Sequence, residues 1–143
     1  RRSRGLGDVY KRQIKVYAKA ESELVDLENQ ERQEYLQMLG IKEPTLDVII
    51  RKGYELLNLF SFFTAGPKEV RAWSVKQGSK APEAAGKIHT DFERGFIKAE
   101  VVSFEDYIAS SGLQNAREKG KLKIEGKDYL VQDGDVIEFK FNV

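Results

Sequence analysis

Residues 46–67 read LDVIIRKGYELLNLFSFFTAGP, and the pattern of apolar residues changes within this stretch. Its first part repeats apolar residues every three or four positions, which predicts a helix that continues to about residue 58. Residues 59–64 are rich in phenylalanine, which favours a strand. The Ala-Gly-Pro of residues 65–67 is typical of a turn. The change from a helical to a strand pattern places a domain boundary near residue 64.

After this boundary, short strand-like segments alternate with helical ones. Strands are predicted over 70–75, 96–102, 122–124, 129–131 and 136–143, and helical segments over 81–88 and 104–110. Residues 112–120 are expected to form a loop with at most one turn of helix. The Asp-Gly pair at 133–134 predicts a tight turn before the last strand. One main helix among several short strands indicates an α+β domain, with a curled sheet and a helix across one of its faces.

The part before the boundary is expected to be mainly helical. Residues 14–17 alternate between apolar and polar and predict a short strand. Residues 21–39 have helical spacing with a break near Asn29, and Gly40 is expected to end the helix. Six acidic residues stand against one arginine in this stretch, which favours a solvated face over a binding site.

The composition excludes several classes of protein. Hydrophobic residues make up 41% and charged residues 33% of the 143 residues, which is typical of a globular chain and not of a mainly disordered one. The chain has no cysteine, so disulfides, thiolate metal sites and a cysteine nucleophile are excluded. No apolar run approaches the roughly 20 residues of a membrane helix, so no membrane partner is expected.

The formal net charge of +1 conceals an uneven distribution. Residues 1–13 carry five basic side chains and one acid, whereas the other 130 residues carry 19 basic and 22 acidic ones. An arginine-rich tail suggests contact with nucleic acid. We interpret residues 1–13 instead as a non-native remnant of a translated sequencing adaptor and exclude them from the fold. From residue 68 onward 13 basic groups balance 13 acidic ones, so any RNA contact depends on a local patch.

The most suggestive chemical cluster is residues 88–96, IHTDFERGF. His89, Asp91 and Arg94 could form a proton relay or a surface contact, but a helix-to-strand turn is the favoured interpretation, with Asp91 capping the turn and His89 orienting it. A metal site is less favoured, because the cluster offers few ligands. No phosphate-binding loop and no Ser-His-Asp triad can be traced in the sequence. We therefore assign no catalytic residue and no metal ligand.

Three longer stretches carry a resemblance. Residues 54–73 (YELLNLFSFFTAGPKEVRAW), 81–97 (APEAAGKIHTDFERGFI) and 125–137 (EGKDYLVQDGDVI) resemble the C-terminal part of the Obg-like YchF family of redox-regulated, ribosome-binding ATPases. The likeness runs from about residue 14 to residue 143. The resemblance implies that residues 65–143 form a TGS domain, which is a ubiquitin-like β-grasp module. It also implies that residues 14–64 are the helical C-terminal end of a P-loop G domain.

The resemblance also assigns residues to roles. It implies that Ala18 and Lys19 fall at the loop that contacts the nucleotide base. It implies a TGS surface that faces the ribosome or RNA, for which the candidates are Arg71, Trp73, Lys87, Arg94 and Lys98. The turn motif of the middle stretch comprises His89, Asp91, Phe92 and Gly95.

Members of the family use ATP, in preference to GTP, with Mg²⁺. Their phosphate loop and switch regions lie in a part of the family that precedes residue 14, so this chain is expected to bind no nucleotide stably and to hydrolyse none. The partner implied is the large ribosomal subunit or its RNA, in the cytoplasm, with no role for DNA. The alternative is a stand-alone β-grasp interaction module or a ligand-binding regulatory module. A phosphate loop encoded upstream of residue 14 would favour the first reading.

Overall fold

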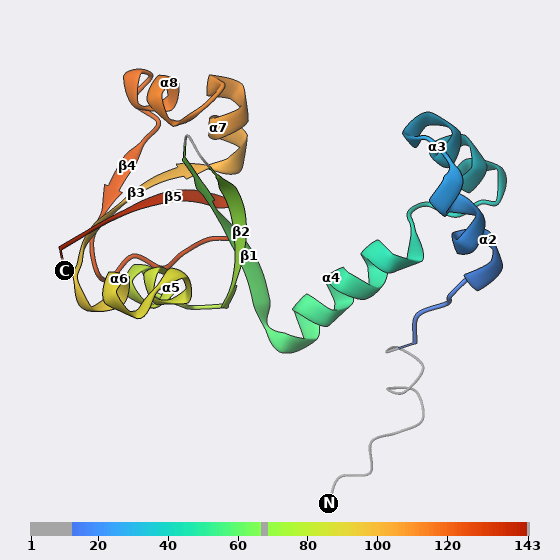
Figure 1. The fold of residues 1–143 in the computed structure, drawn as a ribbon, viewed down its shortest axis with the longest axis horizontal. Helices are drawn as coiled ribbons and strands as arrows, with labels where there is room; N and C mark the ends of the chain where they lie inside the picture. Colours follow the sequence, from blue (N-terminus) through green and yellow to red (C-terminus); the bar gives the residue numbers. More distant parts are fainter. Residues whose placement is uncertain (1–12, 67–68, 143) are drawn as a thin grey trace, which may run out of the picture. The chain divides into compact units, whose positions relative to one another are not determined.

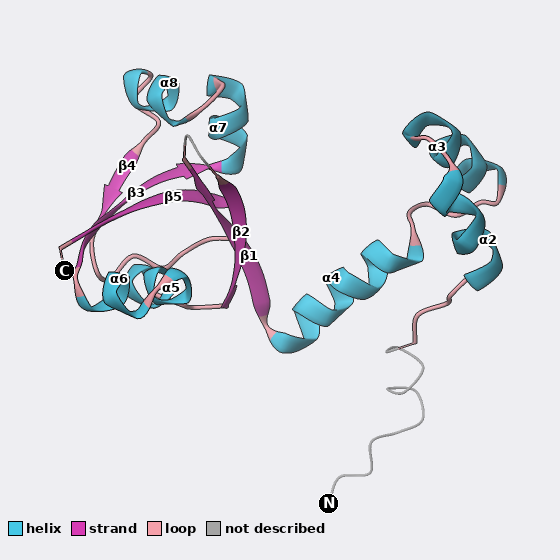
Figure 2. Ribbon diagram, in the orientation of Figure 1, coloured by secondary structure: helices cyan, strands magenta, loops and turns pink. Residues whose placement is uncertain are grey.

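The computed structural model describes residues 13–66 and 69–142, and Figures 1 and 2 show its helices and strands. The adaptor prediction for residues 1–13 lies outside these residues, except for Gln13. The chain divides into two compact units, the first ending at Tyr54 and the second beginning at Glu55. We describe each unit separately.

The first unit is helical, as the sequence predicts. Its elements are α2 (Ala18–Glu23), the 3₁₀ helix η1 (Leu24–Asp26), α3 (Asn29–Met38) and α4 (Thr45–Leu57), whose last turn belongs to the second unit. The break predicted near Asn29 falls at residues 27–28, directly before α3. Gly40 has a φ of +67° and ends α3 as expected, while the Ile41 N–H donates to the Leu36 carbonyl at 2.9 Å.

The strand predicted over residues 14–17 does not form, and this prediction is wrong. A strand is stable only when a neighbouring strand takes up its backbone hydrogen bonds. The described part of the first unit contains no strand that could do so.

A five-stranded mixed sheet forms the centre of the second unit. Its strands are β1 (Leu59–Ala65), β2 (Val70–Lys76), β3 (Phe96–Ser103), β4 (Lys123–Glu125) and β5 (Asp135–Phe141), in the order β2-β1-β5-β3-β4. β1 and β2 form an antiparallel hairpin, β5 runs parallel to β1 at Phe63 and Val136, and β3 pairs antiparallel with both β4 and β5. The mixed α+β class predicted from the sequence is confirmed.

One face of the sheet is covered by α5 (Ala81–Ile88) and α6 (Thr90–Arg94), as Figure 1 shows. Ala81, Ala84 and Ala85 of α5 are fully buried, because small side chains let the helix approach the sheet closely. Opposite them the sheet contributes Phe62, Val75, Phe96, Ala99, Val101, Ile137 and Phe139. The Phe62 and Phe139 rings meet edge to face with their centroids 5.9 Å apart.

Two further helices, α7 (Phe104–Ser110) and α8 (Leu113–Glu118), lie apart from α5 and α6 in Figure 1. α8 is longer than the single turn predicted for this loop. The strand predicted over 129–131 is wrong, since this segment forms only one bridge, between Lys80 and Leu130. The unit that holds the sheet begins at Glu55 and not at residue 65, because β1 pairs with both β2 and β5. No described helix is both long and apolar enough to cross a bilayer.

Candidate functional site

Arg71 and Trp73 lie two residues apart on the edge strand β2, so their side chains share one face of the sheet. The Arg71 guanidinium carbon lies 4.4 Å above the centre of the Trp73 ring, in a cation–π contact. The Trp73 indole N–H donates to the Thr64 hydroxyl at 2.9 Å, and the ring packs against the hydrophobic core. Trp73 therefore covers the margin of the core, and Arg71 is the exposed member of this pair.

Lys87 and Arg94 lie on the same side of the sheet as the core. Lys87 is in the last turn of α5 and Arg94 ends α6, and both side chains are exposed. Helices α5 and α6 pack against each other over the core face. With Arg71, these residues give the helix-covered side three exposed cations at separate positions.

Lys98 points to the other face of the sheet. It alternates along β3 with the core residue Ala99, so its side chain leaves the sheet on the opposite side. There Lys98 lies 3.3 Å from Glu100, a nearly buried carboxylate that also pairs with Arg117 and, at 4.0 Å, with Lys140. The structure thus separates Lys98 from the other candidate cations and places it in an ion-pair network that the sequence did not reveal.

The turn motif connects α5, α6 and β3. The His89 Nδ1 accepts a hydrogen bond from the Asp91 backbone N–H at 3.2 Å, so His89 caps α6, a role that the sequence had assigned to Asp91. Phe92 stacks on Phe141 with ring centroids 3.7 Å apart. Gly95 lies against the backbone of Asn142, where an added Cβ would overlap the carbonyl group. These contacts are those of a structural junction.

Ala18 and Lys19 occupy the first turn of α2 and are both exposed. The Lys19 carbonyl accepts a hydrogen bond from the Ser22 hydroxyl at 2.7 Å. Within residues 13–66 and 69–142, no group of three or more histidine or acidic side chains could hold a metal ion. These residues by themselves do not fit a site for ATP and Mg²⁺, which needs a backbone cradle, a lysine and metal ligands together.

A polar pair, in which Asp135 is buried and Tyr129 is half-buried, fixes the loop before β5. The Tyr129 hydroxyl donates to Asp135 Oδ2 at 2.7 Å, and the Gln132 N–H donates to the same oxygen at 2.8 Å. Burial raises the pKa of Asp135 above its ordinary value, while these two hydrogen bonds and the charge of Lys123 lower it less. Burial, together with the hydrogen bond to Asp135, also raises the pKa of Tyr129. Both side chains are held by this pairing.

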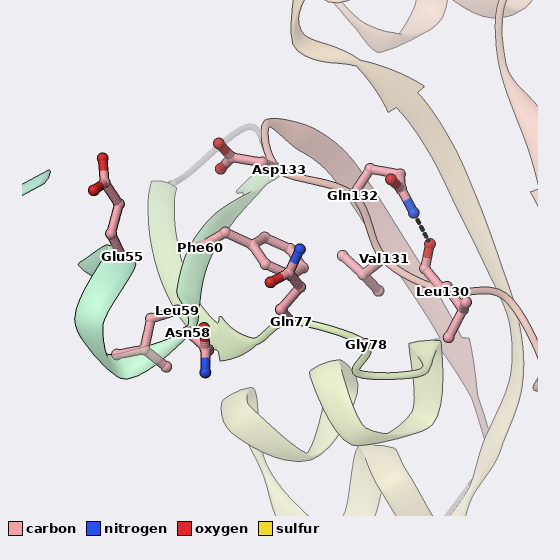
Figure 3. Close-up of a pocket in the computed structure, with 10 residues that line it drawn as sticks. All are labelled: Glu55, Asn58, Leu59, Phe60, Gln77, Gly78, Leu130, Val131, Gln132 and Asp133. Carbon is pink, nitrogen blue, oxygen red and sulfur yellow. Dashed lines mark hydrogen bonds between the residues drawn. The ribbon is translucent and has the colours of Figure 1, made fainter. Parts of the chain in front are cut away.

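A pocket of about 590 Å³ opens beside this loop, and the sequence analysis missed it. It lies where β1 begins and β2 ends, next to residues 130–133 (Figure 3). Three segments that are far apart in the sequence form its walls. No local motif marks such a site. The one sequence signal is that amide and acidic residues (Asn58, Gln77, Gln132 and Asp133) stand near the ends of the predicted strands.

Comparison with known proteins identifies the family. A family model named YchF-GTPase_C and described as "Protein of unknown function (DUF933)" matches residues 59–142. The chain belongs to the YchF family. It is 56% identical over 130 residues to the Ribosome-binding ATPase YchF of Escherichia coli O157:H7 and 58% identical over 130 residues to that of Bacillus subtilis (strain 168).

Each of these alignments covers 91% of this chain but 36% of the relative, so the chain spans about a third of the length of the curated relatives that it matches. Among solved structures, the Schizosaccharomyces pombe YchF GTPase resembles it with a TM-score of 0.72 and 37% identity, covering 82% of this chain and 31% of that one. The five-stranded α+β fold is therefore similar to the C-terminal region of a YchF GTPase.

Proposed function

We propose that this chain is the C-terminal part of a ribosome-binding ATPase of the YchF family and that it acts in the cytoplasm. The observation that carries the proposal is the identity of 56–58% with relatives named Ribosome-binding ATPase YchF over nearly all of the chain. The partner is the large ribosomal subunit or its RNA. ATP, used in preference to GTP, and Mg²⁺ are bound by a part of the family's proteins that precedes the residues matched here.

The second unit is proposed to be a β-grasp TGS domain. Two features support this: the central strands β1 and β5 are parallel, and α5 crosses one face of a mixed sheet. The first unit is proposed to be the end of a G domain, with Ala18 and Lys19 near the nucleotide base. The purified 143-residue chain is expected to show no ATPase activity.

The proposed ribosome-facing surface is the helix-covered side that carries Arg71, Lys87 and Arg94. Binding to RNA phosphates releases counterions, so the affinity falls with salt. We expect the chain to cosediment with large ribosomal subunits, and Arg71→Glu and Arg94→Glu each to weaken binding. Each variant should lower the slope of log affinity against log salt concentration by about one, if each cation contacts one phosphate.

A matched control is Lys119→Glu, which reverses the charge of an exposed lysine at the end of α8, a helix that lies apart from α5 and α6 in Figure 1. It should leave binding close to that of the unchanged chain, and circular dichroism should show that all three variants are folded. Unchanged binding by both Arg71→Glu and Arg94→Glu would reject the surface. Failure of the unchanged chain to cosediment would reject ribosome binding by this part of the family.

A further inference from the structure

The pocket beside the Tyr129–Asp135 pair is built from three tied segments. The Gln77 N–H donates to the Asn58 carbonyl at 2.8 Å, which joins the end of β2 to the start of β1. The Gly134 N–H donates to the Ser61 carbonyl at 2.9 Å, and Asp133 Oδ1 accepts from the Ser61 N–H at 3.2 Å. These hydrogen bonds, two between backbone groups and one to the Asp133 side chain, hold the walls in place, so the pocket is formed without a ligand.

The polar groups that line the pocket are acceptor-rich and carry no positive charge. Asp133 and Glu55 contribute carboxylates, and Asn58, Gln77 and Gln132 contribute carboxamides. No lysine or arginine is among the described lining residues. A phosphate or another anion would therefore meet the negative charge of Asp133 here, and no described lining residue is a cation that could pair with that anion.

Several of these acceptors remain available for a ligand. Asp133 uses Oδ1 for the Ser61 N–H, while its Oδ2 has no hydrogen-bond partner within the described part of the chain. The exposed carboxamides of Asn58 and Gln77 likewise form no hydrogen bond with described residues. Gln132 donates its amide nitrogen to the Leu130 carbonyl at 2.7 Å, as Figure 3 shows, so its oxygen is left as an acceptor.

The pocket also has an apolar floor. Figure 3 shows the Phe60 ring and the Val131 side chain pointing toward each other, with Leu59 and Leu130 at the margins. Such a floor can cover the aliphatic stem of a long basic side chain while the charged end stays at the polar rim. The combination of carboxylate, carboxamide oxygens and an aromatic floor matches a flat cation with several donors.

We propose that this pocket binds an arginine side chain of a partner polypeptide. A guanidinium presents five N–H donors in one plane, can pair with a carboxylate and an amide oxygen at once, and stacks on an aromatic ring. A lysine ammonium is a compact, strongly hydrated charge, so it packs less well than a guanidinium against the aromatic ring. The site is distinct from the cationic surface proposed for the ribosome, so either assignment can fail without the other.

The test is a titration of the ¹⁵N-labelled 143-residue chain, followed by NMR, with the peptide acetyl-Gly-Arg-Gly-amide. The same peptide with citrulline in place of arginine is the matched probe, because citrulline has nearly the same shape and no charge. We expect saturable shifts of the Asn58 and Gln77 side-chain amide signals with the arginine peptide and none with the citrulline peptide. A lysine peptide should bind more weakly than the arginine peptide.

Two pocket variants and one control complete the experiment. Asp133→Asn keeps an oxygen for the Ser61 N–H and removes the charge, so it should weaken arginine binding by about fivefold, the effect of losing one partly exposed ion pair. Gln77→Ala leaves the backbone tie to Asn58 intact and should also weaken binding. Glu118→Gln removes a charge on α8, outside the pocket, and should change nothing. Equal binding of the citrulline peptide, or unchanged binding by both pocket variants, would overturn the assignment.

Discussion

At the residue scale, Asp135 links the stability of the fold to pH. Burial raises its pKa above the ordinary value of 3.8, so the folded chain holds a proton on this group more readily than the unfolded chain. The stabilisation from this proton is present at low pH and is lost as the pH rises through the folded pKa. We expect Asp135→Asn, which can still accept from Tyr129 and Gln132, to remove this loss. The difference in unfolding free energy, variant minus unchanged chain, should therefore be larger at about pH 7 than at about pH 4. Urea denaturation at the two pH values measures it.

Tyr129→Phe provides the complementary variant on the same scale. The Tyr129 hydroxyl lowers the pKa of Asp135 by donating to its carboxylate. Without this donor the pKa of Asp135 should rise further, so the loss of stability with rising pH should become larger and extend to higher pH. If the Asp135→Asn and unchanged chains differed by the same free energy at both pH values, burial of this carboxylate would not cause the pH dependence.

At the scale of elements, the close approach of the α6–β3 junction to the end of β5 depends on Gly95. The Asn142 N–H donates to the Gly95 carbonyl at 2.8 Å, and an added Cβ at Gly95 would overlap the Asn142 backbone. Backbone cannot move aside as a flexible side chain can, so we expect Gly95→Ala to lower the unfolding free energy by about 2 kcal/mol or more. Gly126→Ala is the control, because nothing lies within 4 Å of its added Cβ. Similar urea midpoints for the two variants would contradict this account of the junction.

The same scale shows what the sequence could and could not predict. Strands β1 to β3 and β5 and helix α5 follow from their periodicity, because each buries one face in the way its pattern requires. Helix α4 also forms where its periodicity predicts it, although Leu46, Ile49 and Ile50 on its apolar face are exposed. Residues 14–17 and 129–131 have strand-like composition but lack the neighbouring strand that a ladder needs. The acceptors of the pocket and the cations around Glu100 come from separate segments. Only the fold of the whole second unit brings them together, so no spacing rule could find them.

At the scale of the whole molecule, the second unit contains the hydrophobic core that it needs to fold alone. Every residue of the hydrophobic core lies within it, between Phe62 and Phe139. Removing the residues before Glu55 would cut α4, but the last turn of α4 exposes Leu56 and Leu57 and buries nothing. In the described part of the first unit, by contrast, only Leu24, Leu36 and Thr45 are buried. Too little apolar area is removed from water there to offset the loss of chain entropy.

We therefore expect a chain of residues 55–143 to unfold cooperatively in urea with a midpoint close to that of the full chain. A chain of residues 13–54 should show a broad, non-cooperative change, followed by circular dichroism. The slope of unfolding free energy against urea reports the surface exposed on unfolding. Nearly equal slopes for the 55–143 chain and the full chain would mean that the cooperative transition belongs to the second unit. A 55–143 chain without a cooperative transition would show that the sheet needs the first unit, and the two would then have to be treated as one folding unit.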